Sequence, residues 1–460
     1  MVFSLATLLP WTLPIVVLGA QAPNFKAPSE GPLIASPNFG GPSNSTLPKS
    51  PIVPGRAFDR FLQIWFENTD FATASSTTVF RQLAQQGILL NNYFALTHPS
   101  EPNYVASVGG DFFGMHDDNL YNIPTNISTI VDLLEAKNVS WAEYQESMPS
   151  DGFQGFNFTQ QDYVTPSAPP YTYYVRKHNP LIIFDSVASI PSRAARIRNF
   201  NDFAADVNAS AIPQWAFITP NLVDDAHDTN IDYAAQWIQF WLLPLLNNTD
   251  FNDNRTVVMI TFDENETMTI NNQVLTLLLG GGIPEKLRGT TDSTYYTHYS
   301  ILSTVQNNWG LGSLGRGDTN ATMANVFSFV AEVTGWKNVN VTDNAIPLTN
   351  ISGPIPGPLN SDVYIPFTAP NVSAVGAGGG KVFVAPNINL NLTAANAPAA
   401  VNLTGQGLNV PASGPLNSSA TAPAPGSSPT TSGASNLMRM TIKHLSMLTV
   451  FVVCNPLLWS

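Results

Sequence analysis

The chain has 460 residues, which is enough for one large domain or two ordinary ones. Its formal net charge of -13 argues against nucleic acid or an anionic membrane as a partner bound through a general basic field. Charged residues make up only 11%, while Gly and Pro are plentiful, a balance that suits a secreted, glycan-coated surface better than a cytosolic one.

The N-terminal residues 1–22 are interpreted as a secretory signal peptide. The apolar stretch from Leu5 to Leu18 leads into Ala20-Gln21-Ala22, which has the small-x-small pattern of a cleavage site. The alternative is a membrane anchor, which the short length and two prolines of the stretch disfavour. Residues 23–55 are rich in Pro, Ser and Gly, and we expect them to be extended.

The region 56–345 is expected to be the catalytic domain. Short apolar or β-branched runs predict strands at 60–66, 214–219, 256–262 and 274–279. Helical spacing predicts helices at 128–136, with Ser128 as the cap, at 232–246 and at 300–309. Strands that alternate with helices predict an α/β fold: a three-layer α/β/α domain with a largely parallel central sheet.

The C-terminal part differs in composition. Residues 346–435 are rich in Pro, Ser, Ala and Asn and are expected to be a glycosylated stalk, although part of this range could complete the catalytic domain. Residues 436–460 contain a spacer and an apolar tail, an order that matches a glycosylphosphatidylinositol (GPI) attachment signal. The alternative is a short membrane helix, which Asn455-Pro456 interrupts.

Glycosylation sequons are dense along the chain. Fifteen Asn-x-Ser/Thr sequons predict N-glycans and passage through a eukaryotic secretory pathway. The only cysteine, Cys454, lies in the apolar tail, so no intrachain disulfide can form. Stability is therefore expected to come from the size of the core, and a bound metal would add to it. We expect a secreted or cell-surface protein whose only membrane attachment is a GPI anchor.

Acidic pairs follow two of the predicted strands. Glu67-Asn68 follows the strand 60–66, and Asp263-Glu264 follows the strand 256–262. Ligands of open α/β sheets gather at the carboxyl ends of the strands. Because oxygen ligands from two such ends can converge on one cation, the pattern indicates a metal-assisted hydrolase.

Ser100 stands between two prolines in Thr97-His98-Pro99-Ser100-Glu101-Pro102-Asn103-Tyr104, ahead of a predicted helix. Prolines restrict the backbone and lower the entropic cost of holding the hydroxyl in place. Such a serine is well placed as a nucleophile if a base or a metal activates it. From composition alone, a purely structural loop is the alternative.

Three further histidines stand in suggestive settings. Lys177-His178 places two basic groups side by side, and His227 lies in an acidic loop that follows the strand 214–219. Histidine is well suited to proton transfer near neutral or mildly acidic pH. His298 lies at the start of the predicted helix near 300, where a plain helix cap is the alternative.

Six stretches together resemble the phosphoesterase family that contains fungal secreted acid phosphatases and bacterial phospholipases C, within the alkaline-phosphatase-like superfamily. They occur in the family's order over about residues 58–335: Glu67-Asn68-Thr69-Asp70-Phe71, residues 92–104, Lys177-His178-Asn179-Pro180, His227-Asp228-Thr229, Phe262-Asp263-Glu264 and Tyr296-Thr297-His298-Tyr299-Ser300.

The resemblance implies roles for individual residues. Ser100 corresponds to the nucleophile that forms a phosphoseryl intermediate, and His178 and His227 to the pair that grips the phosphoryl oxygens or protonates the leaving group. The implied metal ligands are Glu67, Asn68, Asp263 and Glu264. The expected substrate-binding residues are His98, Asn103, Lys177 and His298. The ligands leave the metal open among Mg²⁺, Ca²⁺, Mn²⁺ and Zn²⁺.

The stretch after Asp263-Glu264 departs from the phospholipase branch, which usually continues with His-Gly-Gly. Here Asn265-Glu266-Thr267 follows, which favours the acid-phosphatase branch. Because Asn265 is a sequon beside the implied metal, we predict that it is unglycosylated or points away from the pocket. The sequence thus predicts a phosphate monoesterase working on small phosphorylated substrates at acid pH. A phosphodiesterase or phospholipase C, or an inactive surface glycoprotein, are the alternatives.

Overall fold

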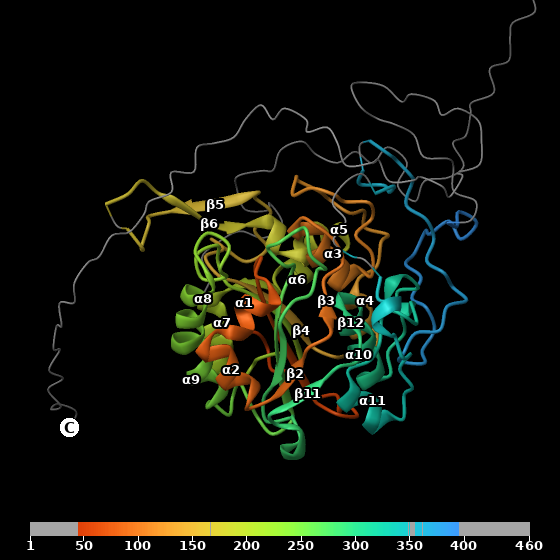
Figure 1. The fold of residues 1–460 in the computed structure, drawn as a ribbon. Coiled ribbons are helices and arrows are strands. Elements are labelled where there is room, and N and C mark those ends of the chain that lie inside the picture. The colour runs from red at the N-terminus through yellow and green to blue at the C-terminus, as the bar shows by residue number, and fades with distance from the viewer. Residues whose placement is uncertain (1–44, 166, 348, 350–354, 361, 395–460) are drawn as a thin grey trace, which may run out of the picture. The chain divides into compact units, whose positions relative to one another are not determined.

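The structure is a computed structural model that describes residues 45–165, 167–347, 349, 355–360 and 362–394. Its centre is an eight-stranded sheet, drawn with the helices in Figure 1. In spatial order the strands are β11 (Thr290–Asp292), β2 (Ile88–Leu90), β10 (Thr276–Leu279), β9 (Thr256–Phe262), β1 (Arg60–Phe66), β8 (Trp215–Thr219), β4 (Trp141–Gln145) and β7 (Ile197–Asn199).

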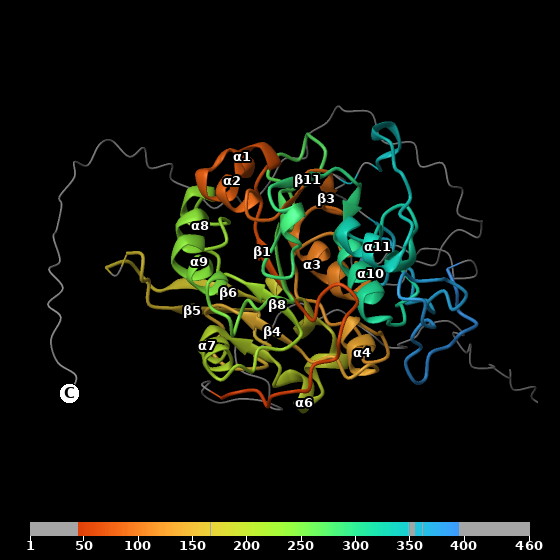
Figure 2. The ribbon, with the colours of Figure 1, turned by 90° about the horizontal axis from the view of Figure 1, so that it is seen from below.

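Helices cover both faces of this sheet, as Figures 1 and 2 show. One face carries α1 (Phe71–Ser76), α2 (Thr78–Ala84), α7 (Phe200–Asn208), α8 (Ile231–Trp237) and α9 (Leu243–Leu246). The other face carries α3 (Ser100–Gly109), α4 (Ile130–Glu135), α10 (His298–Trp309) and α11 (Ser328–Thr334). The short helix α6 (Pro191–Ala194) lies near β4 in Figure 2, and α5 (Asp185–Ala188) contacts α6. The predicted three-layer α/β/α architecture is confirmed.

The sheet is largely parallel, as the sequence predicts. Strand β1 pairs in parallel with both β8 and β9, and β4 pairs in parallel with β8 and β7. Of the eight strands of this sheet, only β10 runs antiparallel to its neighbours, β9 and β2. Both β1 and β9 are buried along their whole length, which explains their nearly continuous apolar sequences. Because they pair in parallel in the interior of the sheet, their carboxyl ends lie side by side.

The strands and helices that the sequence predicts lie close to their expected bounds, whereas β2, β4, β7 and β11 of the main sheet are not predicted. The strands at 60–66 and 256–262 have the predicted bounds, while β8 and β10 begin one and two residues later than predicted. The helical stretch at 232–246 is observed as α8, a π-helical turn at Ile238–Leu242, and α9. The predicted cap Ser128 is wrong: Thr129 caps α4, and Asp132 completes the capping box.

Two small two-stranded sheets stand apart from the main one. Strand β3 (Tyr93–Phe94) pairs with β12 (Tyr296–Thr297), which joins the segment before Ser100 to the start of α10. Strands β5 (Asn157–Gln160) and β6 (Tyr171–Val175) form a hairpin that projects from the domain near its upper side in Figure 1. The first small sheet therefore braces the segment that carries Ser100.

The described residues between 355 and 394 lie against the catalytic domain, although the sequence analysis assigns them to a stalk. The N–H of Leu359 donates to the carbonyl of Phe113, and the rings of Phe113 and Phe367 lie 5.5 Å apart. Val382 bridges to Ser313 beyond the end of α10. The apolar side chains of Leu359 and Phe367 are buried in the core, which explains this packing.

The segments assigned to the signal peptide (1–22) and the GPI signal (436–460) lie outside the described residues, as does most of 23–55. The part of the chain that the structure does describe contains no helix long and apolar enough to cross a membrane.

Candidate active site

Three carboxylates meet at the carboxyl edge of the sheet. Phe66 at the end of β1 lies beside Phe262 at the end of β9, because the two strands pair in parallel. The residue after each is acidic, so Glu67 and Asp263 leave the sheet side by side. Glu67, Asp263 and the following Glu264 are 0%, 0% and 2% exposed. Parallel pairing thus brings together the two acidic pairs of the sequence.

Ser100 contacts this acidic group from the first turn of α3. Its hydroxyl oxygen lies 3.0 Å from Oε2 of Glu67 and 3.2 Å from Oε1 of Glu264. One turn further along the same helix, the hydroxyl of Tyr104 donates to Oε1 of Glu67 over 2.7 Å. At the N-terminus of α3, Ser100 also lies where the helix dipole favours developing negative charge. This placement suits a nucleophilic hydroxyl.

Two buried histidines contact the same carboxylates. Nδ1 of His98 lies 2.5 Å from Oε2 of Glu264, and Nε2 of His178 lies 3.0 Å from Oε1 of Glu67. Nδ1 of His178 faces Asp225 over 3.4 Å. Burial on its own lowers the pKa of His178, but the charges of Glu67 and Asp225 outweigh burial and raise it. Conversely, burial favours a higher pKa for Glu67, and His178 pulls that pKa below its usual range.

Lys177 and His227 form a more open cationic rim. Lys177 lies in the short helical turn Arg176–His178, with Nζ 3.1 Å from Oδ2 of Asp118. Nε2 of His227 lies 3.4 Å from the same Nζ. The side chain of His227 is 32% exposed, whereas Ser100 is 2% exposed. An anion that approaches from solvent therefore meets positive groups at the rim.

The structure places Asn103 and His298 differently from the substrate-binding role expected of them. Both are fully buried. Oδ1 of Asn103 accepts two N–H groups of the loop before α3, and its Nδ2 donates to two carbonyls of that loop. Nε2 of His298 lies 2.7 Å from the carbonyl of Asp263, and Nδ1 lies 3.1 Å from the hydroxyl of Tyr93. Both side chains therefore support the backbone behind the site.

Burial also fixes the charge of His298. It lowers the pKa of His298 to about 4, so the ring is neutral through most of the acid range. A neutral ring that donates from Nε2 to the carbonyl of Asp263 leaves Nδ1 free to accept from Tyr93. The hydrogen bonds and the neutral state are thus consistent.

Four residues lie at the site without a role predicted from the sequence: Tyr104, Asp118, Asp225 and Asp228. A signal existed for three of them. Tyr104 follows Ser100 at the i+4 spacing of a helix face, and Asp225 and Asp228 flank His227 closely in the chain. Asp118 reaches Lys177 from a loop 59 residues away, which no local pattern indicates.

The buried oxygens of the site fit a bound cation. Both carboxylate oxygens of Asp263 and the amide oxygen of Asn68 are buried without a hydrogen-bond partner of normal geometry. Burial, reinforced by the charges of Glu67 and Glu264, raises the pKa of Asp263 well above its usual range. In the described part of the chain no three His, Cys, Asp or Glu side chains already stand as a formed metal site. Unpaired buried oxygens among clustered carboxylates are nonetheless the donor set that hard divalent cations take.

Asp70 pins the loop that follows Asp263-Glu264. Asn265 is 0% exposed, and its Nδ2 donates to Oδ1 of Asp70 over 3.2 Å and to the carbonyl of Thr267 over 2.9 Å. Asp70 also accepts the N–H groups of Glu266 and Thr267. The amide nitrogen that a glycan would occupy is therefore enclosed by protein.

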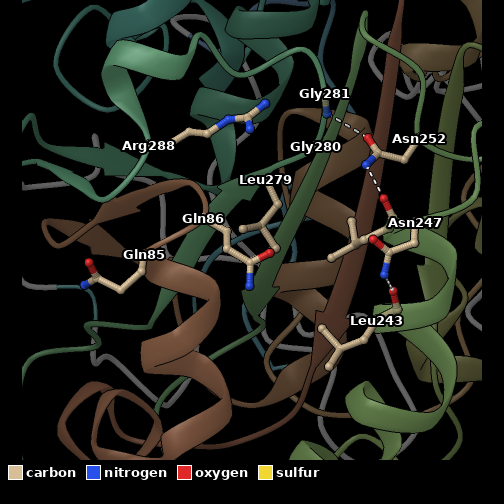
Figure 3. Close-up of a pocket in the computed structure, with 10 residues that line it drawn as sticks. Gln85, Gln86, Leu243, Asn247, Asn252, Leu279, Gly280, Gly281 and Arg288 are labelled. Atoms are coloured by element: carbon tan, nitrogen blue, oxygen red, sulfur yellow. Dashed lines mark hydrogen bonds between the residues drawn. The ribbon is translucent and has the colours of Figure 1, made fainter.

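The cavity in Figure 3 lies at the other end of β9. It has a volume of about 470 Å³, and its walls include Asn252 just before β9 and Gly280 and Gly281 just after the antiparallel β10. Strand β9 carries its site residues at its opposite, carboxyl end. None of the acidic or basic residues of the candidate site lines this cavity.

Comparisons with known proteins identify the family of this chain. The sequence profile of the Phosphoesterase family matches residues 59–312. An acid phosphatase of Aspergillus fumigatus is 47% identical over 70% of this chain and 69% of its own length. A probable acid phosphatase of Kluyveromyces lactis is 50% identical over 71% of this chain and 74% of its own length.

Among solved structures, a protein of the alkaline phosphatase superfamily from Vibrio parahaemolyticus is 10% identical, over 57% of this chain and 70% of that chain, with a TM-score of 0.35. Such a loose overlap adds nothing to the assignment. The profile match and the two fungal relatives are sufficient: the chain belongs to the phosphoesterase family and is a phosphoric ester hydrolase related to fungal acid phosphatases.

Proposed function

We propose that this phosphatase hydrolyses small phosphate monoesters at acid pH through a phosphoserine intermediate on Ser100. The observation that carries the proposal is the position of the Ser100 hydroxyl, 3.0 Å and 3.2 Å from two buried carboxylates and behind the cationic rim of Lys177 and His227. The relatives named acid phosphatases support the monoester as the substrate class.

Each group of the site has a step to perform. The oxygen of Ser100 attacks phosphorus, the bond to the ester oxygen breaks, and the leaving alkoxide takes a proton from Nε2 of His227. The carboxylate of Glu264, whose Oε1 lies 3.2 Å from the Ser100 hydroxyl, takes up the serine proton. Water then attacks the phosphoserine and gives its proton to His227, and the serine oxygen recovers its proton as phosphate leaves. Lys177 holds the phosphoryl oxygens throughout.

A divalent cation fits the proposal, with Glu67, Asn68, Asp263 and Glu264 as the groups that would hold it. When bound, it would supply positive charge that lowers the pKa of the serine hydroxyl and stabilises negative charge on the phosphoryl group. Prolonged dialysis against a chelator is expected to abolish activity, and re-addition of Mg²⁺, Ca²⁺, Mn²⁺ or Zn²⁺ separately would identify the ion. Full activity in the chelated protein would contradict this part of the proposal.

Acidic conditions keep the proton donor charged. Burial on its own lowers the pKa of His227, but its hydrogen bond to Asp228 and the charge of Glu67 raise that pKa to about 9. Because a raised pKa means that the proton is held until the pH passes that value, His227 is protonated at acid and neutral pH. Activity is therefore expected to fall on the alkaline side as His227 loses its proton.

The test compares a monoester with a diester. Initial rates on p-nitrophenyl phosphate and bis-p-nitrophenyl phosphate would be measured across pH for the wild type, Ser100→Ala and the control Ser107→Ala. Ser107 lies on the same helix and is also buried, but its hydroxyl bonds only to the carbonyl of Tyr104. The proposal expects monoester cleavage that Ser100→Ala lowers by about a thousandfold or more and Ser107→Ala leaves largely intact.

Other outcomes would redirect the assignment. Preference for the diester with the same dependence on Ser100 would establish the phosphodiesterase or phospholipase C alternative. Comparable activity in Ser100→Ala and the wild type would remove Ser100 from the mechanism.

We also propose that the protein is secreted or held at the cell surface by a GPI anchor and carries N-glycans. The exposure of its sequons supports this: of the sequon asparagines in the described residues, Asn265 alone is buried. Glycopeptide mapping of protein secreted by a fungal host is expected to find glycans at exposed sites such as Asn254 and Asn320, and none at Asn265. A glycan at Asn265 would contradict the enclosed loop described above.

A further inference from the structure

The acidic residue beside His227 has no part in the steps above, yet it is the closest contact of that ring. Nδ1 of His227 lies 2.6 Å from Oδ1 of Asp228. The other carboxylate oxygen of Asp228 accepts the hydroxyl of Tyr171, which lies on strand β6 of the projecting hairpin. Because a carboxylate accepts and does not donate, Nδ1 of His227 must carry the proton of this bond.

The backbone of the loop 225–228 restricts the position of the His227 ring. Ala226 has a φ of 86°, an unusual value for a residue with a side chain. The N–H of His227 donates to Oδ1 of Asp225, and the N–H of Asp228 donates to the carbonyl of Leu222. These bonds fix the backbone position of His227, and Asp228 then fixes the orientation of its imidazole ring.

With Nδ1 occupied, the other ring nitrogen points to the rim. Nε2 of His227 lies 3.4 Å from Nζ of Lys177. When both groups are charged they repel each other at this distance, and an anionic phosphoryl group between them relieves the repulsion. The geometry therefore leaves Nε2 as the nitrogen that can serve a substrate.

We propose that Asp228, held in turn by Tyr171, is a positioning residue that keeps Nδ1 of His227 engaged and directs Nε2 toward the leaving group of the phosphate ester. This inference rests on the proposed function of His227 as the proton donor. It adds a connection from the β5–β6 hairpin to the chemistry: the hairpin sets the orientation of a carboxylate, and the carboxylate sets the orientation of the acid.

The charges around the ring agree with this arrangement. Asp228 and Glu67 raise the pKa of His227, Asp225 acts in the same direction, and Lys177 opposes them. His178 also faces the ring, with the ring centres 6.0 Å apart. Replacing Asp228 by a neutral group removes one of the largest contributions that keep His227 protonated, so His227 would lose its proton at lower pH.

Two esters whose leaving groups differ in basicity distinguish a misoriented proton donor from a general loss of activity. Only the misoriented donor affects the two esters unequally. The nitrophenolate of p-nitrophenyl phosphate departs with little help from an acid, whereas the alkoxide of glycerol phosphate needs a proton. Values of kcat/KM for both esters would be measured across pH for the wild type, Asp228→Asn, Tyr171→Phe and the control Asp232→Asn. Asp232 is an exposed carboxylate on the following helix α8, outside the site.

Asp228→Asn is expected to lose about a hundredfold on glycerol phosphate but less than about tenfold on p-nitrophenyl phosphate. The alkaline limb of its profile of kcat/KM against pH is expected to move to lower pH by about one unit. Tyr171→Phe is expected to shift both quantities in the same direction by smaller amounts, and Asp232→Asn to shift neither. Tyr171 is only partly buried, so Tyr171→Phe keeps the test valid if Asp228→Asn does not fold.

Equal losses on the two esters with an unmoved alkaline limb, in a wild type that cleaves both, would overturn the positioning role and leave the proposed function standing. If the wild type cleaved neither ester with divalent metal supplied, the proposed function would fail and this inference with it.

Discussion

The two ends of strand β9 differ in what they offer a ligand. At its amino end lies an open cavity of about 470 Å³ whose walls carry exposed polar side chains such as Gln85, Gln86 and Arg288. At its carboxyl end Glu67, Asp263 and Glu264 are buried together, and two of them contact the hydroxyl of Ser100. Among the residues that the structure describes, no acidic side chain lines the cavity at the amino end, whereas three carboxylates converge at the carboxyl end.

The difference shows what marks the site in this fold. Burying several carboxylates is unfavourable unless a counter-charge compensates for it, so their clustering needs a reason beyond stability. A cavity lined by exposed side chains carries no such cost and needs no explanation. The carboxyl edge is therefore assigned the chemistry, and substitutions at the two ends of β9 should differ widely in effect.

The largest expected effect among these substitutions comes from Asp263→Asn. It removes a charge whose two oxygens are buried and unpaired, so cation binding should weaken and kcat/KM should fall by roughly 100- to 1,000-fold. Metal titration of the chelated protein, followed by activity, would measure both changes. Glu266→Gln, an exposed carboxylate three residues away, is the matched control. Equal metal affinity in Asp263→Asn and the wild type would show that Asp263 at the carboxyl end of β9 does not hold the cation.

His298→Asn should show whether His298 supports the backbone at the carboxyl edge of the sheet or contacts the substrate. The substitution removes a buried ring that hydrogen-bonds to the carbonyl of Asp263 and packs 4.6 Å from the ring centre of Trp65. We expect roughly 2–4 kcal/mol lower stability in denaturant unfolding, with KM for p-nitrophenyl phosphate changed by less than about threefold. A large rise in KM without loss of stability would restore the substrate-binding role that the sequence suggested.

Glu143→Gln tests whether a buried carboxyl away from both ends of β9 changes the stability of the protein with pH. Glu143 lies within β4, accepts from Nε2 of Gln145 and from the N–H of Leu181, and has its pKa raised by burial to about 8. A raised carboxyl pKa contributes stability that is fully present below the ordinary value near 4.5 and is lost as the pH rises toward 8.

In Glu143→Gln this loss should disappear, so the fall in Tm between about pH 5 and pH 8 should be smaller by roughly 2–5 °C. Activity at acid pH should stay near the wild-type value. An unchanged slope of Tm against pH would show that Glu143 does not titrate in this range.

The smallest effect is expected at the cavity. Arg288→Ala removes an exposed cationic side chain from its wall, and kcat/KM for p-nitrophenyl phosphate should stay within about twofold of the wild type. A larger loss of activity, at unchanged Tm, would mean that the amino end of β9 also takes part in catalysis.

The sequence predicted those features that local patterns determine. Strands β1 and β9 are buried on both faces, so their continuous apolar runs and the acidic residues that end them stand out. Ser128 and Thr129 are adjacent hydroxyl residues, and only the reciprocal bonds of Thr129 and Asp132 decide which one caps α4.

Contacts between distant segments could not be predicted in the same way. Asn103 looks available for substrate in the motif, but the loop before α3 folds over it and uses all of its polar atoms. Likewise, the hydrogen bond from Tyr171 to Asp228 joins a hairpin to a loop 57 residues away. Such pairings depend on the register and twist of the sheet, which a single sequence does not specify.

Trapping the phosphoserine intermediate on Ser100 tests the proposed mechanism most directly. The wild type would be mixed with p-nitrophenyl phosphate, quenched in acid within the first turnovers, digested and mapped by mass spectrometry. One added phosphoryl group is expected on the wild-type peptide that contains Ser100, and none is expected in Ser100→Ala. Rapid turnover with an unmodified Ser100 peptide, or with phosphate on another residue such as His227, would contradict the proposed mechanism.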